Sequence, residues 1–317
     1  MRKILITGGA GFVPSSLAER LLDDPENFVV LVDNLLTGHL YNVPDHPNCK
    51  FIKGDANRYE EIAAIMTAYR FDYVFHYAAV VGVKRTLANP VMVLDDINGI
   101  NHVLSLSKNT GVKQVFFSSS SEVYGEPVHL PQHEETTPLN SRLPYAVVKN
   151  VGESFCRSFK QEYGLDYTIF RFFNTYGPKQ STDFVMSKFI DSALKGEPLT
   201  IYGDGSQTRT FCYIDDNIEV ALKLLETNSG QDQVINVGND IPTTILELAE
   251  LIKDMTESDS PIIHLPPLKE GDMTRRQPDI AQMKGIIGKD LVKLEVGMEQ
   301  VISARRKMLK AGGVIMA

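Results

Sequence analysis

The stretch Ile4-Leu-Ile-Thr-Gly-Gly-Ala-Gly-Phe-Val-Pro14 decides the fold. It begins with apolar residues typical of a buried strand, passes through three glycines and leads into a helical pattern over Ser15–Leu22. Glycines let the chain turn tightly and let its backbone approach a pyrophosphate. The free N–H groups and positive dipole end of the next helix attract that anion. A glycine loop in this strand–turn–helix context predicts a dinucleotide site.

Two further residues refine this prediction. Pro14 occupies the place where such loops normally carry a last glycine, so we expect a local shift of the helix without loss of binding, because proline is tolerated in a first helical turn. Asp33 ends the second predicted strand. A carboxylate there accepts hydrogen bonds from both ribose hydroxyls and repels a 2′-phosphate, which favours NAD over NADP.

The first half of the chain alternates buried strands with helical patterns, which predicts an α/β fold with a doubly wound parallel sheet. The expected strands are Lys3–Thr7, Phe28–Val32, Lys50–Lys53, Tyr73–His76, Gln114–Ser118 and Tyr167–Phe172. The expected helices after the first are Arg58–Ala68, Val91–Asn109 and Tyr145–Tyr163.

The second half differs in pattern and predicts a smaller α/β substrate domain interleaved with the first. We place residues 1–173 and about 213–239 in the dinucleotide-binding domain, and about 174–212 and 240–317 in the substrate domain. Gly203-Asp-Gly-Ser206 is interpreted as a hairpin-like turn. Helices are expected over Phe184–Lys195, Asp215–Thr227, Leu246–Met255 and Val296–Leu309, and one more buried strand over Val234–Val237.

Composition excludes several classes of protein. The formal net charge of −8 disfavours non-specific nucleic-acid binding. No apolar run is long enough for a transmembrane helix, and the first residues are too short an apolar run for a signal peptide. Cys49, Cys156 and Cys212 have no metal-ligand spacing, and we interpret them as reduced thiols of a cytoplasmic protein without a metal site.

Tyr145 and Lys149 begin a helical pattern, and their four-residue spacing places both on one face. A free tyrosine has a pKa near 10, so it needs a neighbouring cation to act as a base near neutral pH. Lowering that pKa by about three units requires roughly 4 kcal/mol, which Lys149 and a positively charged nicotinamide could supply. Ser120 follows a predicted strand, where it could donate to a substrate hydroxyl.

With these residues the chain resembles the extended short-chain dehydrogenase/reductase family, specifically its nucleotide-sugar epimerases, dehydratases and decarboxylases. The resemblance runs over nearly the whole chain and implies a Rossmann-type fold. It is carried by Thr7–Gly11, Asp33-Asn34, Gly54-Asp55, 76–79, Ser119–Gly125, Tyr145–Lys149, Arg171–Pro178 and Tyr202–Phe211.

The resemblance implies roles at matching positions. It places the cofactor on Gly8, Gly11, Phe12, Val13, Asp33, Asn34, Asp55, Ala56, Ala78, Ala79, Tyr145 and Lys149. It places the nucleotide sugar on Asn174, Lys188, Tyr202, Arg209 and Arg275, of which the two arginines resemble those that hold the diphosphate. It also suggests a homodimer in which the helices near 91–109 and 145–163 form a four-helix bundle.

The family mechanism begins with oxidation of a sugar hydroxyl, usually at C4, with Tyr145 as base. The resulting 4-keto sugar is acidic at C5, where Glu122 is available for proton transfer. Dehydratases have an Asp-Glu pair where this chain has Ser121-Glu122. Decarboxylases resemble the Ser-Glu arrangement, yet usually carry an arginine where this chain has Phe184.

We therefore expect an epimerase of a nucleotide sugar, with a UDP-sugar as the favoured substrate. Decarboxylation of a UDP-uronate is the alternative, and dehydration is the third. A protein that binds NAD only as a sensor also stays open, because fold does not fix function. Such a protein would be expected to have lost Ser120, Tyr145 or Lys149, and this chain retains all three.

Overall fold

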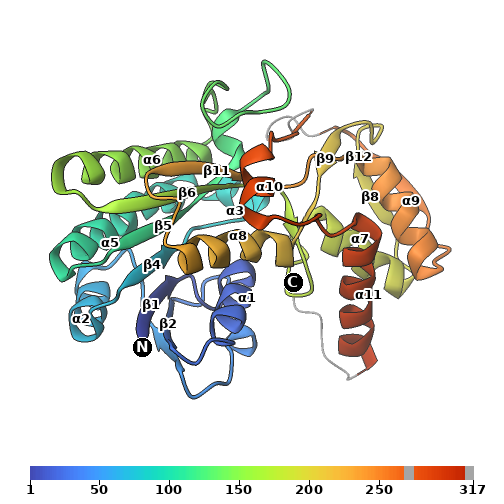
Figure 1. The fold of residues 1–317 in the computed structure, drawn as a ribbon. Coiled ribbons are helices and arrows are strands. Elements are labelled where there is room, and N and C mark those ends of the chain that lie inside the picture. The colour runs from blue at the N-terminus through green and yellow to red at the C-terminus, as the bar shows by residue number, and fades with distance from the viewer. Residues whose placement is uncertain (268–274, 311–317) are drawn as a thin grey trace.

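The computed structural model describes residues 1–267 and 275–310 and is built on a parallel sheet of seven strands (Figure 1). The strand order is β11-β6-β5-β4-β1-β2-β3, and every neighbouring pair is parallel. The strands are β1 (Arg2–Thr7), β2 (Asn27–Asp33), β3 (Cys49–Lys53), β4 (Tyr73–His76), β5 (Gln114–Ser120), β6 (Asp166–Phe172) and β11 (Gln233–Val237). The order reverses direction beside β1, so a crevice is expected there at the carboxyl ends of the strands.

Helices cover both faces of the sheet. On one face α1 packs against α8, and α8 packs against α10; on the other, α5 lies between α2 and α6 (Figure 1). Their bounds are α1 (Phe12–Leu21), α2 (Tyr59–Tyr69), α3 (Val83–Ala88), α4 (Pro90–Leu94), α5 (Asp96–Thr110), α6 (Pro144–Tyr163), α8 (Ile214–Thr227) and α10 (Ala281–Ile287), with short 3₁₀ turns η1 (Leu40–Asn42) and η2 (Ser121–Tyr124). Successive side chains of β1 point to opposite faces of the sheet, so they pack in two hydrophobic cores. Ile4 and Ile6 belong to one core, and Leu5 belongs to the other. The doubly wound Rossmann-type fold is thus confirmed.

The helix expected over Val91–Asn109 is divided at Asp95 into α4 and α5. At this point the Asn98 N–H bonds to the Asp95 carbonyl, only three residues back, at 3.0 Å. Such tightening is common at helix ends and does not alter the apolar period, which is why the pattern alone predicts one helix.

A second group of elements lies beside the sheet (Figure 1). It comprises β7 (Thr175–Tyr176), α7 (Val185–Lys195), β8 (Leu199–Tyr202), β9 (Thr208–Thr210), β10 (Cys212–Tyr213), β12 (Pro242–Thr244), α9 (Ile245–Thr256), β13 (Ile262–Leu265) and α11 (Leu294–Lys310). Helix α7 packs against α9, and α11 contacts both. The domain limits given above stay a prediction, although α10 packs on α8 and β11 of the large sheet.

The hairpin expected at Gly203–Ser206 is wrong. Gly203 and Gly205 do turn the chain, with φ of 71° and 82°. The strands on either side nevertheless pair elsewhere: β8 is parallel to β13, and β9 is antiparallel to β12. Turn residues predict where the chain bends, but they do not predict which strands pair. The partner strands here lie within residues 242–265, far along the sequence.

In the described ranges, no helix is long and apolar enough to cross a membrane.

Gly152 sets the spacing between α6 and the sheet. A Cβ added there would lie 2.3 Å from Phe117 Cζ, in a buried ring contact. We expect Gly152→Ala to lower the free energy of unfolding by about 1–3 kcal/mol, because the core must shift to admit a methyl group. Urea unfolding measures the change. The control is Gly285→Ala in α10, where an added Cβ meets no atom within 4 Å, and which should be neutral or stabilising by up to about 1 kcal/mol. Equal losses in both variants would contradict this account.

Candidate active site

A cavity of about 750 Å³ opens along the carboxyl ends of the strands. All twelve residues that the sequence assigns to the cofactor line it, as do Ser120, Glu122 and Asn174. Ligands of open α/β sheets bind at this edge, where the strand order reverses. The cavity therefore brings the predicted cofactor and catalytic side chains into one site.

The glycine loop crosses the floor of the cavity against the loop that follows β4. Gly8 has a φ of +72°, and a Cβ there would lie 3.0 Å from the backbone of Ala78. Gly11 is the N-cap of α1 and its carbonyl accepts from the Ser15 N–H at 3.2 Å. Both the conformation and the close approach require glycine at residue 8. Phe12 and Val13, the first residues of α1, line the cavity, and no side chain caps the helix, so a pyrophosphate could bind at this helix start.

Pro14 lies buried in the first turn of α1. Pro14 is the third residue of the helix, so an N–H at this position would have no intrahelical acceptor. The Ala10 carbonyl lies outside the helix and accepts from the His39 N–H and from Asn42 Nδ2, both at 3.0 Å. The proline therefore fits the first turn without loss of a helical hydrogen bond.

Acidic and amide groups mark one end of the cavity. Asp33 is buried, and its carboxylate accepts the N–H of Ala10 at 3.0 Å and of Leu35 at 2.7 Å. Burial raises the pKa of Asp33, and these two hydrogen bonds oppose the rise. Asn34 Nδ2 donates to Asp55 at 3.1 Å. This end offers the acceptors that an adenosine ribose requires, and the Asp33 carboxylate would repel a 2′-phosphate.

Ser120, Tyr145 and Lys149 meet at the other end. Lys149 is 2% exposed, its Nζ lies 3.3 Å from Ser118 Oγ, and it stands 5.6 Å from the centre of the Tyr145 ring. Burial lowers the pKa of Lys149 to about 8. Burial and the Glu122 charge raise the pKa of Tyr145, while a hydrogen bond with Ser120 opposes the rise. In the protein alone Tyr145 is thus a protonated phenol beside a lysine that titrates near neutral pH.

Glu122 adds a carboxylate to this end of the cavity. It lies in η2, where Ser120 is the N-cap: the Glu122 N–H donates to Ser120 Oγ at 3.2 Å. Its Oε1 lies 3.6 Å from Nη2 of Arg276, a largely buried residue that sequence reasoning missed. Glu122 and Arg276 both act on the Tyr145 hydroxyl electrostatically, with opposite signs. A carboxylate and a cation therefore lie beside Tyr145.

Four predicted substrate residues lie outside the cavity lining: Lys188, Tyr202, Arg209 and Arg275. Arg275 is exposed and its backbone pairs with Thr208 in an isolated bridge. Neighbouring side chains of an extended segment point to opposite sides, so Arg276 enters the cavity and Arg275 does not. The sequence shows two adjacent arginines, but it does not show which of the two points into the cavity, because that depends on how the segment pairs with Thr208. Asn174 lines the cavity and donates to the Thr210 carbonyl at 3.1 Å.

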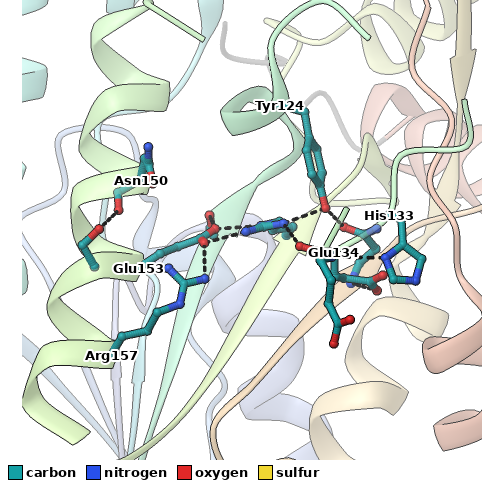
Figure 2. A network of polar contacts seen from close by, with 11 residues as sticks. Tyr124, His133, Glu134, Asn150, Glu153 and Arg157 are labelled. Atoms are coloured by element: carbon teal, nitrogen blue, oxygen red, sulfur yellow. Dashed lines mark hydrogen bonds and ion pairs between the residues drawn. The ribbon is translucent and has the colours of Figure 1, made fainter. Parts of the chain in front are cut away.

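A buried polar network supports the strand that carries Ser120 (Figure 2). Glu153 of α6 accepts Ser119 Oγ at 2.7 Å and two bonds from Arg171 of β6, at 2.9 and 2.7 Å. Arg171 also donates to the Tyr124 hydroxyl at 2.8 Å, and that hydroxyl donates to Asn236 at 2.7 Å. Burial alone would raise the pKa of Glu153, but Arg171 outweighs it and holds that pKa below its usual value. The network ties β5, β6, α6 and β11 together directly behind the catalytic candidates.

The fold and site define a dinucleotide-binding protein of the Rossmann class. The model of the NAD dependent epimerase/dehydratase family matches residues 4–238. UDP-glucuronic acid decarboxylase 1 of Danio rerio is 36% identical over 95% of this chain and 72% of its own length. The chain therefore belongs to the NAD-dependent epimerase/dehydratase family, within the extended short-chain dehydrogenase/reductase group.

Solved structures agree with this assignment. UDP-glucose 4-epimerase of Thermotoga maritima, solved with UDP-glucose, has a TM-score of 0.91 and 33% identity, and the match covers 97% of this chain and 99% of that one. UDP-glucuronic acid 4-epimerase of Bacillus cereus, solved with UDP-glucuronic acid and NAD, has a TM-score of 0.88 and 28% identity, covering 96% and 99%. The cofactor is NAD, and the solved neighbours include enzymes that act on nucleotide sugars. The glycine loop and Asp33 fit that cofactor.

The buried pair Glu153–Arg171 yields a stability prediction. We expect Glu153→Gln to cost about 3–5 kcal/mol, because it leaves the 2%-exposed Arg171 guanidinium without a counter-charge. Arg157→Gln is the control: Arg157 bonds to the same carboxylate but is 43% exposed, so its loss should cost less than about 1 kcal/mol.

The stability that Glu153 contributes should fall at acid pH. The folded pKa of Glu153 is depressed, so its contribution is present above the unfolded value of about 4.3 and is lost as pH falls further. Chemical denaturation at neutral and acid pH measures both effects. A Glu153→Gln loss as small as that of Arg157→Gln would refute this role.

Proposed function

We propose that this protein is an epimerase of a nucleotide sugar, most simply a UDP-sugar, that works through a 4-keto intermediate. The observation that carries the proposal is the convergence of Ser120, Tyr145, Lys149 and Glu122 on one cavity with the cofactor loop. The relatives include UDP-sugar epimerases and decarboxylases, and both classes are compatible with a C4 oxidation. The first step is thus common to both, and the fate of the 4-keto intermediate decides the outcome.

In the first step Tyr145 removes the proton of the C4 hydroxyl, which Ser120 holds by a hydrogen bond. NAD held by the glycine loop and Asp33 would supply an acceptor for the C4 hydride and give that hydride back. The Lys149 ammonium stabilises the tyrosinate, because an opposite charge nearby favours the charged form of an acid. Tyr145 then returns its proton as the hydride adds to the opposite face of the 4-keto sugar, and the product is the C4 epimer.

Glu122 gives the site a second capacity. The 4-keto group acidifies the C5 hydrogen, and a carboxylate beside Tyr145 can remove and return that proton. We propose that Arg276, which enters the cavity, holds the diphosphate in place of Arg275. Guanidinium donors match phosphate oxygens in geometry and charge.

Decarboxylation of a UDP-uronate is the second candidate, supported by the identity of 36% to a UDP-glucuronic acid decarboxylase. Against it stands Phe184, which lines the cavity at the place where decarboxylases usually carry an arginine. Dehydration is the third candidate, and Ser121 offers no acid for loss of the C6 hydroxyl. A sensor that binds NAD without turnover is the remaining alternative.

The deciding experiment is incubation with NAD and a panel of UDP- and dTDP-sugars that includes UDP-glucuronate. Mass spectrometry and NMR of the products separate the candidates: unchanged mass with inverted stereochemistry supports epimerisation. Loss of carbon dioxide shows a decarboxylase, and loss of water shows a dehydratase. NAD binding without any turnover across the panel supports the sensor.

Two variants separate the steps of the mechanism. Tyr145→Phe should lower turnover by about 10²–10⁴, because it removes the general base. Glu122→Gln should spare NAD binding and C4 oxidation but stop incorporation of solvent deuterium at C5. Stopped-flow absorbance of reduced cofactor and NMR of the sugar measure the two steps. Full turnover in Tyr145→Phe, or undiminished deuterium uptake in Glu122→Gln, would refute the respective assignment.

We also propose a cytoplasmic homodimer, in which α5 and α6 pair with the same helices of a second copy. A shallow groove between these helices is lined by Asn101, Ser105, Asn150, Ser154, Phe155 and Phe159, among others. Ser154→Arg places a large cation on this face and should convert dimer to monomer. Sedimentation velocity measures the state, with Ser206→Arg on an exposed loop as control. A wild-type monomer would refute the dimer.

A further inference from the structure

Asp96 is a buried carboxylate in the cavity wall that the mechanism above does not use. It is the first residue of α5 and only 8% exposed, yet it lines the same cavity as Lys149 and Tyr145. Charged side chains are rarely buried unless they are paired and hydrogen-bonded. Its partners therefore indicate what it does.

The two carboxylate oxygens of Asp96 reach two different loops. Oδ2 accepts the Val80 N–H at 2.8 Å, in the loop after β4, and Oδ1 accepts Asn57 Nδ2 at 3.1 Å, in the loop after β3. Asn57 in turn donates its backbone N–H to Asp55 at 2.9 Å. Asp55 and Ala79, beside Val80, are both proposed cofactor contacts, so one carboxylate joins loops at separate parts of the cofactor site.

The surroundings are shaped for this junction. Gly99 follows Asp96 by three residues and so lies on the same face of α5. A Cβ at Gly99 would lie 2.2 Å from Asn57 Oδ1, so only glycine leaves room for the Asn57 side chain. The Asn57 side chain therefore lies in the space left by Gly99 and donates to the Asp96 carboxylate. Two independent features of α5 fix the same side chain.

The charge of Asp96 acts on Lys149. Burial lowers the pKa of Lys149, and the Asp96 carboxylate opposes that fall. Within residues 1–267 and 275–310, the other groups that contact or act on Lys149 carry no negative charge: they are Ser118 Oγ, the Phe117 and Tyr145 rings, and His76. His76 is a neutral imidazole, because burial and then Lys149 lower its pKa to about 3. Asp55 acts on Asp96, whereas Glu122 and Arg276 act on Tyr145.

We propose that Asp96 is a positioning residue with two linked tasks: it fastens the loops after β3 and β4 to each other, and it supplies the counter-charge that keeps Lys149 an ammonium beside Tyr145. The charge task rests on the proposed roles of Lys149 and Tyr145. The fastening task rests on the hydrogen bonds alone.

The two tasks are separable by substitution. Asp96→Asn has the same shape: its amide oxygen accepts from Val80, and Asn57 can rotate its own amide to present an oxygen. It therefore removes the charge and retains the junction. Asp96→Ala removes both. Glu60→Gln, an exposed acid at the start of α2, controls for net charge because water and salt screen it.

The direct test follows Lys149 by NMR of ¹⁵N- and ¹³C-labelled lysine side chains, with Lys149→Met to assign the signal. Lys149 should titrate near pH 8 in the wild type, at its pKa of about 8. In Asp96→Asn it should titrate lower by about one pH unit, since loss of an opposite charge favours the neutral amine. Glu60→Gln should leave it unchanged. An unchanged midpoint in folded Asp96→Asn overturns the charge task.

A second measurement needs no variant of Asp96. In the wild type, the Asp96 carboxyl ¹³C signal should show a step at the midpoint of Lys149, and that step should vanish in Lys149→Met. Its absence in the wild type overturns the charge task even if Asp96→Asn does not fold.

Calorimetry of NAD binding tests the fastening task. Asp96→Ala should weaken NAD binding at least about tenfold, as two buried hydrogen bonds are lost. Asp96→Asn should bind NAD within about twofold of the wild type, because it retains the junction. Equal affinities in all three proteins overturn the fastening task.

Turnover supplies the last readout. Removing the Asp96 charge favours the tyrosinate and the neutral lysine, so both limbs of the pH–rate profile should move to lower pH. At about pH 7.5 a shift of one unit in the pKa of Lys149 leaves about a third as much ammonium, so kcat should fall on the alkaline limb and rise on the acid limb. A pH–rate profile that does not move overturns the charge task. Absence of turnover on every sugar would refute the proposed function, whereas the NMR and NAD-binding results would still decide the role of Asp96.

Discussion

The structure depends on one buried ion pair, Glu153 with Arg171, because it joins the three elements that carry the active site. Its carboxylate holds Ser119, one residue before Ser120, and it lies one turn after Lys149 on α6. A buried ion pair stabilises a fold only when its remaining donors and acceptors also have hydrogen-bond partners. Here Ser119 and Arg157 donate to Glu153, and Tyr124 accepts from Arg171. The buried hydrogen bonds of Glu153 with Ser119 and Arg171 thus fix Ser120 of β5 relative to Lys149 of α6, away from solvent.

Near this ion pair, four of the charged side chains that line the cavity are linked in two pairs. The Asp96 carboxylate acts on Lys149, and Glu122 lies 3.6 Å from Arg276. Each of these pairs matches a carboxylate with a cation, which lowers the cost of burying both charges. Tyr145 stands between the pairs, and its acidity responds to both.

Much of this was predictable from the sequence, for identifiable reasons. The glycine loop, Asp33 and the Tyr145–Lys149 spacing are local patterns, and local patterns specify strand ends and helix faces. Arg276 and Asp96 were missed because their roles depend on contacts between distant segments: an extended register beside Thr208 selects Arg276, and loops after β3 and β4 converge on Asp96. The hairpin at Gly203 was wrong for the same reason, since β8 and β9 take partners far along the chain.

The substitution of proline for glycine at residue 14 has a consequence for the cofactor's arrival. The Ala10 carbonyl, which no residue of α1 claims, fastens the loop to the segment 39–42 through His39 and Asn42. Proline also narrows the conformations open to the loop before anything binds. The phosphate cradle is thus preorganised, and less of the binding free energy is spent on ordering it. We therefore expect the glycine loop to change little in conformation when the dinucleotide binds.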